Sequence, residues 1–305
     1  LGLVAVLAGS VPPDHLRHTY FDLPDGALIE LSEGPTTTAA AARGVGPDLL
    51  PYFALMTPGV YMSSTGFAAQ RYMSLMAQVP LLFSKERTDA LLICFGAGNT
   101  ARALLAAPQL ERLDVVDISP EVISLSKHFA SVHGGDPLDD PRVTVHVDDG
   151  RRFLGITPRR YDVITLEPPP PGHAGVVNLY SREYYATAKA ALKPDGVLAQ
   201  WLPVFQLAPE ETVAILASIV AEFPHTALFQ GIAHQWYVLG SLQPLEVDVA
   251  GWDRHLAQPS VAAEMARVAM HGGTAGVLAT FMVGDATLRE AAASDRAVFV
   301  FDGVD

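Results

Sequence analysis

Glycine and acidic residues that could bind a nucleoside recur along the middle of the chain, each time directly after a short apolar run. They are Gly96 and Gly98, Asp117, Asp149 and Gly150, and Glu167. Apolar runs of this kind are typical of parallel strands that are covered on both faces. Ligands of such sheets bind outside the carboxyl ends of the strands, so these positions are the candidate site.

Each position offers different chemistry. The turn from Gly96 to Ala101 reads G-x-G-x-x-A, which lets the backbone approach a ligand closely. Asp117, about 20 residues further on, can accept hydrogen bonds from ribose hydroxyls, and its neighbour Ile118 is a further candidate nucleoside contact. The G-x-G-x-x-A pattern also fits a dinucleotide enzyme.

The residues after the third and fourth apolar runs, Asp149-Gly150 and Glu167, bear on which class of ligand is bound. An acid followed by glycine, Asp149-Gly150, can accept a bond from an adenine amino group, which favours an S-adenosyl ligand over a dinucleotide. Glu167 precedes four prolines, 168–171, and its position faces the reacting group. A purely structural role for Glu167 is an equal alternative at this point.

The elements that position these residues alternate between strand and helix. Helical spacing predicts a helix over 67–83, and Ser119 followed by Pro120 predicts a helix start. The strands are predicted at 90–95, 113–116, 143–147, 161–166 and 197–201, and further helices at 100–107, 119–133, 151–154, 181–192 and 209–223.

This order predicts an α/β fold with a doubly wound, Rossmann-like, mostly parallel sheet. Three regions are expected: a small N-terminal β-strand and loop region over 1–66, the Rossmann-like domain over 67–245, and a helical extension over 246–305. Glycines and prolines indicate loops in 44–66, and segments 226–229 and 236–241 are expected to pair and close the sheet edge.

Composition excludes several classes of function. A net charge of −13 argues against a nucleic-acid partner or an anionic membrane surface and suits a cationic small molecule, or simply aids solubility. The single cysteine, Cys94, excludes an internal disulfide, and the ten histidines show no metal-ligand spacing, so no metal is expected. Cys94 is expected to be buried within a strand, and His128 and His133 to lie at the surface.

The first residues, Leu1 to Gly9, are apolar but too short to span a bilayer. They fit either a buried strand or the end of a removed upstream segment.

The sequence around these residues resembles the spermidine synthase (polyamine aminopropyltransferase) family, which has a class I methyltransferase-type fold. The segments that carry the resemblance are LLICFGAGNTARALL, LDVVDISPEVISLSKHF, LDDPRVTVHVDDGRRFL, YDVITLEPPPP and NLYSREYYATAKAALKPDGVLAQWLP, within 67–202. AGVVNLYSREYY and QWLP resemble most the branch in which this domain is fused to membrane helices. That likeness implies a cytoplasmic domain with a membrane tether in the full-length protein.

The resemblance implies decarboxylated S-adenosylmethionine as donor and a small amine such as putrescine as acceptor. Asp117 would hold the ribose and Asp149 the adenine, and Gly96 and Gly98 would pass beneath the donor. Tyr72 matches a tyrosine that lines the acceptor pocket. A homodimer through the N-terminal strands is a further implication.

The departures from the family pattern concern catalysis. In the glycine loop G-G-G-D-G-G, Ala97 replaces the acid that meets the aminopropyl amine. Met73 replaces a glutamine after the tyrosine. In the catalytic stretch D-S-x-D-P, Glu167 replaces the first acid, and the proton-accepting acid falls on Pro170 or Pro171.

Three hypotheses therefore remain open. The chain is an aminopropyltransferase-like enzyme in which Glu167 substitutes as the acid, with His173 or Tyr180 assisting; or it is a methyltransferase that uses S-adenosylmethionine itself; or it is a non-catalytic module that binds a nucleoside or polyamine. A basic residue placed for the donor carboxylate would favour the methyltransferase.

Overall fold

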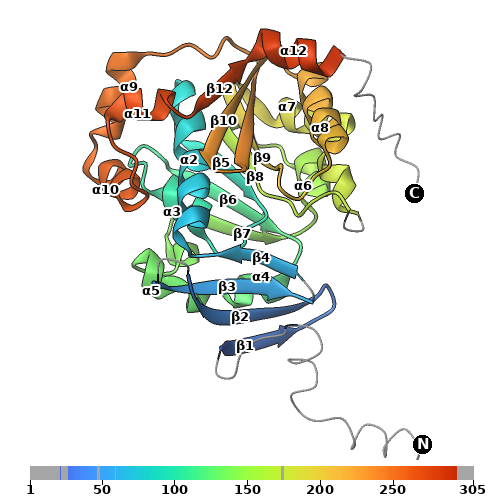
Figure 1. Ribbon diagram of the computed structural model, residues 1–305, viewed down its shortest axis with the longest axis vertical. Helices are drawn as coiled ribbons and strands as arrows, with labels where there is room; N and C mark the ends of the chain where they lie inside the picture. The colour runs from blue at the N-terminus through green and yellow to red at the C-terminus, as the bar shows by residue number, and fades with distance from the viewer. Residues whose placement is uncertain (1–20, 22–26, 47–48, 59, 173–174, 294–305) are drawn as a thin grey trace, which may run out of the picture.

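The computed structural model describes residue 21 and residues 27–46, 49–58, 60–172 and 175–293. The predictions for Leu1 to Gly9 and for His173 lie outside these residues. The described chain forms a small sheet and a large sheet with helices on both faces of the large one, as Figure 1 shows.

The small sheet is an antiparallel meander in the order β1-β2-β3-β4, drawn in blue in Figure 1. Its strands are β1 (Leu28–Glu33), β2 (Thr38–Val45), β3 (Pro51–Thr57) and β4 (Val60–Ser64). The expectation of loops over 44–66 was wrong for β3 and β4. Pro51 stands at the first position of β3, where a missing N–H is tolerated, so the turn residues bound the strands rather than interrupt them.

The large sheet has eight strands in the order β12-β10-β11-β9-β8-β5-β6-β7. Strands β9, β8, β5, β6 and β7 are parallel neighbours, and β11, β10 and β12 add antiparallel ladders. Their bounds are β5 (Asp89–Ile93), β6 (Arg112–Asp117), β7 (Val143–Val147), β8 (Tyr161–Leu166), β9 (Leu192–Pro203), β10 (His225–Ile232), β11 (Gln235–Ser241) and β12 (Phe281–Gly284). The predicted doubly wound, mostly parallel sheet is confirmed.

Two sets of helices cover the faces of the large sheet (Figure 1). On one side lie α2 (Phe67–Phe83), α3 (Asn99–Leu105), α4 (Pro120–Ser124), α5 (Ala130–His133), α9 (Val249–Leu256), α10 (Pro259–Arg267) and α11 (Gly273–Leu278). On the other side lie α6 (Gly150–Ile156), α7 (Arg182–Ala191), α8 (Pro209–Glu222) and α12 (Asp285–Ala293).

The predicted helix over 119–133 is broken into two short helices with a 3-10 turn at Ser126–His128 between them. Ser119 does cap α4, since its hydroxyl accepts a bond from the Val122 amide. The break coincides with serines that bond elsewhere: the Ser124 hydroxyl donates to the Glu121 carbonyl, and Ser126 donates to Asp136. Serine hydroxyls compete in this way with the regular helical pattern.

The edge of the large sheet also differs from expectation. Strands β10 and β11 pair as predicted, but β12 lies outside β10 and forms the edge. β12 comes from the segment predicted to be helical, and it is only four residues long. A four-residue strand held by pairing with β10 carries too little periodicity to be recognised in an alanine-rich segment.

Candidate functional site

The chain order reverses at β5, which is flanked by β6 on one side and β8 on the other. A cavity of about 400 Å³ lies where the carboxyl ends of these three strands meet. Its walls include Cys94 and Gly96 after β5, Asp117 at the end of β6, and Glu167 after β8. This is the switch point at which open α/β sheets bind ligands.

The Asp117 carboxylate is held by two backbone amides. Oδ2 accepts from the Phe95 N–H and Oδ1 from the Ser119 N–H, each at 2.9 Å. Burial raises the pKa of Asp117 to about 6, although the two backbone bonds oppose that shift. Each carboxylate oxygen has lone pairs for a further donor, so the fixed carboxylate can accept from ligand hydroxyls in the cavity.

The turn after β5 depends on glycine. Gly96 has φ +59° and Gly98 has φ +83°, in the left-handed region that favours glycine. A Cβ on Gly98 would lie 3.0 Å from the Phe95 ring, and one on Gly96 would lie 3.1 Å from Ser63 Oγ. Gly96 lines the cavity, whereas Gly98 begins α3 as its N-cap and is not part of the lining.

Cys94 also adopts a left-handed backbone, with φ +69°. It follows β5 and lines the cavity, so the expectation of a cysteine within the strand was wrong. Burial raises the pKa of the Cys94 thiol well above its usual range, so the thiol stays protonated. A non-glycine residue in this conformation is strained, and such residues concentrate at functional sites.

Ala97 stands where the family pattern has an acid, and both its backbone N–H and its backbone carbonyl are hydrogen-bonded. Its N–H donates to Ser63 Oγ at 3.3 Å, and its carbonyl accepts from His133 Nε2 at 2.7 Å. The Arg102 guanidinium, which only donates, lies 3.1 Å from His133 Nδ1. His133 is therefore neutral, with its proton on Nε2, and burial lowers its pKa to about 4.

The expectation of His133 at the surface was wrong, because only 8% of the residue is exposed. Its position depends on a buried ion pair between Arg102 of α3 and Glu264 of α10. Arg102 Nη2 lies 2.7 Å from Glu264 Oε1, and Arg102 Nε lies 3.0 Å from Oε2. The C-terminal extension thus supports the glycine loop through three side chains.

Glu167 faces the cavity from the end of β8 and accepts bonds from the hydroxyls of Thr100 and Tyr72. Burial raises the pKa of Glu167 to about 7, while the two hydroxyls act to lower it. Tyr72 is itself buried and stacks on Trp201, with ring centroids 5.7 Å apart. The structure therefore brings the predicted residues Tyr72 and Glu167 into one hydrogen-bonded group.

A smaller cavity of about 120 Å³, here called the side pocket, shares four wall residues with the main cavity. It is lined by Val60, Tyr61, Met62, Glu167, Pro169, Pro170, Trp201 and Gln206. The small sheet contributes residues to both cavities. Met62 lines both of them, and Ser63 lines the main cavity. These small-sheet residues were not among the predicted site residues, because no motif marks them.

The remaining predicted residues flank the cavity. Ile118 lines it and is 57% exposed. Asp149 is the exposed N-cap of α6, where Oδ1 accepts from the Arg152 amide at 2.8 Å, and it is not part of the lining. Gly150 is buried, and a Cβ there would lie 2.5 Å from Ile93 Cγ2. The neighbouring Asp148 is held by an ion pair with Arg152.

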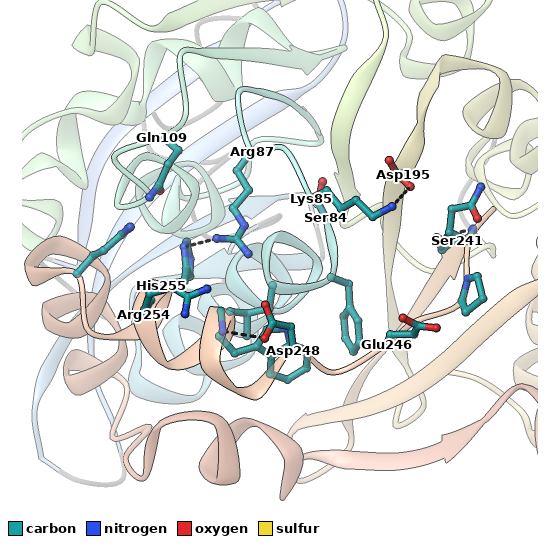
Figure 2. A pocket seen from close by; sticks show the side chains of 17 residues that line it. Ser84, Lys85, Arg87, Gln109, Asp195, Ser241, Glu246, Asp248, Arg254 and His255 are labelled. Atoms are coloured by element: carbon teal, nitrogen blue, oxygen red, sulfur yellow. Dashed lines mark hydrogen bonds and ion pairs between the residues drawn. The ribbon is translucent and has the colours of Figure 1, made fainter.

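A second and larger cavity, of about 770 Å³, lies near the opposite ends of the strands (Figure 2). Arg87 and His255 point toward each other there, 3.2 Å apart, and Lys85 pairs with Asp195. None of the predicted site residues lines this cavity.

Within the described residues there is no group of three or more histidine, cysteine or acidic side chains that could hold a metal ion. No described helix is both long and apolar enough to cross a membrane.

Comparison with known proteins agrees with this geometry. Residues 69–229 match the Spermine/spermidine synthase domain family. The chain belongs to that family. The spermidine synthase crystal structure in complex with the transition state analogue AdoDATO superposes with a TM-score of 0.70, at 20% identity over 87% of this chain and 88% of that one. The spermidine synthase of Thermotoga maritima gives a TM-score of 0.69, at 19% identity over 87% of both chains. The predicted family and fold class are confirmed.

Curated members of the family match over a shorter range. The polyamine aminopropyltransferase of Bacillus subtilis is 34% identical over 159 residues, which are 52% of this chain and 56% of the relative. Polyamine aminopropyltransferase 1 of Pseudomonas aeruginosa is 31% identical over 145 residues, 47% of this chain and 50% of the relative. The chain therefore spans about half the length of these curated relatives.

Proposed function

We propose that this member of the spermidine synthase family is a transferase. It moves the aminopropyl group of decarboxylated S-adenosylmethionine to an amine, with Glu167 as the general base. The observation that carries the proposal is the Glu167 carboxylate. It faces the cavity, is hydrogen-bonded to Tyr72, and has a pKa raised to about 7. A carboxylate in this range is suited to accept a proton near neutral pH.

The electrostatics of the cavity favour a cationic donor. Asp117 and Glu167 are the charged side chains among its described lining residues, and that lining contains no lysine, arginine or histidine. Two carboxylates suit a sulfonium and an ammonium group. The carboxylate of ordinary S-adenosylmethionine would have no cationic partner in this lining. This supports the decarboxylated donor and argues against the methyltransferase alternative.

In the proposed complex the nucleoside lies between the glycine turn and the end of β6. Asp117 accepts from the ribose hydroxyls, Gly96 allows close approach, and Ile118 contacts the base. We also propose that Asp149 meets the adenine amino group, although this requires its exposed side chain to turn away from its capping position. Because Gly98 and Gly150 have no side chains, the backbone at these positions can pack closely around the ligand.

The proposed step is an in-line displacement. A free alkyl amine has a pKa near that of lysine, about 10.4, so it is an ammonium ion near neutral pH and must lose a proton before its nitrogen can attack. The amine nitrogen bonds to the methylene carbon next to the sulfonium, while the carbon–sulfur bond breaks and its electron pair returns to sulfur. The amine proton passes to Glu167, and the products are an aminopropylated amine and methylthioadenosine. Tyr72 and Thr100 orient the Glu167 carboxylate for this role.

The test is release of methylthioadenosine from decarboxylated S-adenosylmethionine by the purified chain, followed by chromatography with a panel of primary amines. We expect amine-dependent release that Glu167→Gln abolishes. Methylated amine formed from ordinary S-adenosylmethionine would replace the proposal with methyl transfer. Tight binding of methylthioadenosine in calorimetry, with no turnover of either donor, would establish the non-catalytic alternative instead.

A further inference from the structure

The cavity near the opposite ends of the strands, here called the far cavity, has a charged wall that the proposed reaction does not use (Figure 2). Its volume of about 770 Å³ lies in the range of small-molecule sites, roughly 300–1,000 Å³. Its described lining carries as many cationic as carboxylate side chains: Lys85, Arg87 and Arg254 against Asp195, Glu246 and Asp248. Lys85 and Asp195 form an ion pair at 3.1 Å, but the other four make no ion pair with the described residues. Two cations and two carboxylates of this wall therefore have no ionic partner there.

The Arg87 guanidinium is held in place by neutral acceptors. Its Nε donates to the Leu81 carbonyl at 2.6 Å, and its Nη1 lies 3.2 Å from Nδ1 of His255, toward which it points in Figure 2. Because a guanidinium only donates, Nδ1 is the acceptor, and the proton of the ring is on Nε2, which lies 3.0 Å from Gln78 Oε1. Burial lowers the pKa of His255 to about 4, so the ring is neutral. Arg87 is thus a positioned cation whose Nη2 makes no hydrogen bond to the part of the chain that the structure describes.

A second polar group of the same wall also lacks a partner. Gln258 Oε1 is buried and accepts no hydrogen bond from the described residues. The backbone N–H of Gln258 donates to the His255 carbonyl at 3.1 Å, so Gln258 and Arg87 both contact His255. A buried acceptor without a donor carries a desolvation penalty that a bound donor would remove. A cation that lacks an anion and an acceptor that lacks a donor therefore adjoin the same histidine.

These two groups and the balanced charge of the wall select the class of ligand. The flat guanidinium fork matches a carboxylate, and Gln258 Oε1 requires a donor. Glu246 and Asp248 would repel a doubly charged anion, and the two unpaired arginines would repel a simple cation. We propose that the far cavity binds a free α-amino acid, whose carboxylate pairs with Arg87 and whose ammonium group donates to Gln258 Oε1. The far cavity and the main cavity share no described lining residue, so this inference does not depend on aminopropyl transfer.

The matched probes for the test are norleucine and hexanoate, which differ only in the α-amino group. Binding of each to the purified chain is measured by calorimetry. We expect norleucine to bind at least about tenfold more tightly, because hexanoate cannot donate to Gln258 Oε1. Equal or weaker binding of norleucine overturns the inference.

Arg87→Gln locates the site. We expect the affinity for norleucine to fall by about tenfold or more, since the carboxylate loses its charged partner. The matched control is Arg160→Gln, at an exposed arginine outside the cavity that donates only to the Arg159 carbonyl, and it should leave the affinity unchanged. An affinity for norleucine that survives Arg87→Gln would place the amino acid elsewhere and overturn the inference.

Gln258→Leu provides a second variant, which keeps the inference testable if Arg87→Gln does not fold. The Gln258 side chain makes no capping bond to α10, and the change removes a buried acceptor that has no partner, so the fold should persist. We expect the affinity for norleucine to fall by about tenfold while the affinity for hexanoate stays the same. No loss for norleucine, or equal losses for the two probes, would contradict the inference.

Discussion

His133 Nε2 lies 2.7 Å from the carbonyl oxygen of Ala97, and this bond ties the buried side of the glycine loop to the helices behind it. His133→Ala removes the donor and leaves a buried carbonyl unpaired, which costs about 1 kcal/mol or more. We expect the affinity for methylthioadenosine to fall by about five- to tenfold, measured by calorimetry. His128→Ala, at a histidine paired with Glu30 away from the loop, should leave the affinity unchanged. Equal losses in the two variants would show that the bond does not position the loop.

Asp117→Asn replaces a carboxylate that accepts two backbone bonds by an amide that can accept only one of them. Hydrogen bonds to charged groups contribute about 1.5–3 kcal/mol, so we expect nucleoside affinity to fall by about 10- to 100-fold. Asp139→Asn, at an exposed acid outside the cavity, is the matched control. Retained affinity in Asp117→Asn would place the nucleoside elsewhere.

Glu167→Gln keeps the shape of the side chain and removes its capacity to take a proton. A general base contributes about 100- to 10,000-fold to rate, so we expect kcat to fall by that range while donor affinity changes little. Single-turnover release of methylthioadenosine measures the chemical step directly. A loss of affinity with unchanged single-turnover rate would assign Glu167 to binding alone.

The pH dependence follows from the pKa of Glu167, which burial raises to about 7. The base form is absent at acidic pH and is gained as pH rises through that value. We therefore expect kcat/KM to increase by about tenfold per pH unit below 7 and to level off above it, because kcat/KM reports the pKa values of the free enzyme. The raised pKa of Glu167 also makes the free energy of unfolding depend on pH, in the opposite direction to the rate. Between pH 4.5, the ordinary pKa, and about pH 7, the folded state binds the proton more tightly than the unfolded state. The stabilising contribution is therefore present at acidic pH and is lost as pH rises through 7. A rate that is flat from pH 5.5 to 8 would contradict the assignment of Glu167 as base.

The ion pair between Arg102 and Glu264 is nearly inaccessible to solvent, so its loss leaves an unpaired buried charge. We expect Glu264→Ala to lower the free energy of unfolding by about 3–5 kcal/mol, measured by urea denaturation. Glu290→Ala on α12, at an exposed residue, should change it by less than about 0.5 kcal/mol. Similar losses for the two variants would mean that the extension contributes little to the stability of the loop.

Sequence reasoning worked best where local signals and tertiary packing agree. The helical spacing over 67–83 and the apolar runs over 143–147 and 161–166 predicted α2, β7 and β8 with the observed bounds. The glycine and acidic residues at strand ends led to the cavity because the topology brings those ends together. Gly96, Asp117 and Glu167 were found in this way.

The missed features all depend on partners that are distant in sequence. His133 is buried beside Arg102, which is itself paired with Glu264, and nothing near residue 133 reveals that pairing. Strand β12 exists because β10 presents a free edge. Met62 and Ser63 reach the cavity because the small sheet packs against the end of the large one, which no local pattern encodes.

The pairing of Arg102 with Glu264 also sets an order of events during synthesis. The ribosome makes the glycine loop and α3 early, whereas the carboxylate that neutralises Arg102 emerges only with α10, near the end of the described chain. Until then the Arg102 guanidinium has no carboxylate partner. The contacts that it supports, to His133 and through His133 to the Ala97 carbonyl, are incomplete. The glycine loop is thus translated among the first parts of the large domain, and its buried hydrogen bonds are completed among the last, so a nascent chain cannot present a finished cavity before its C-terminal helices have docked.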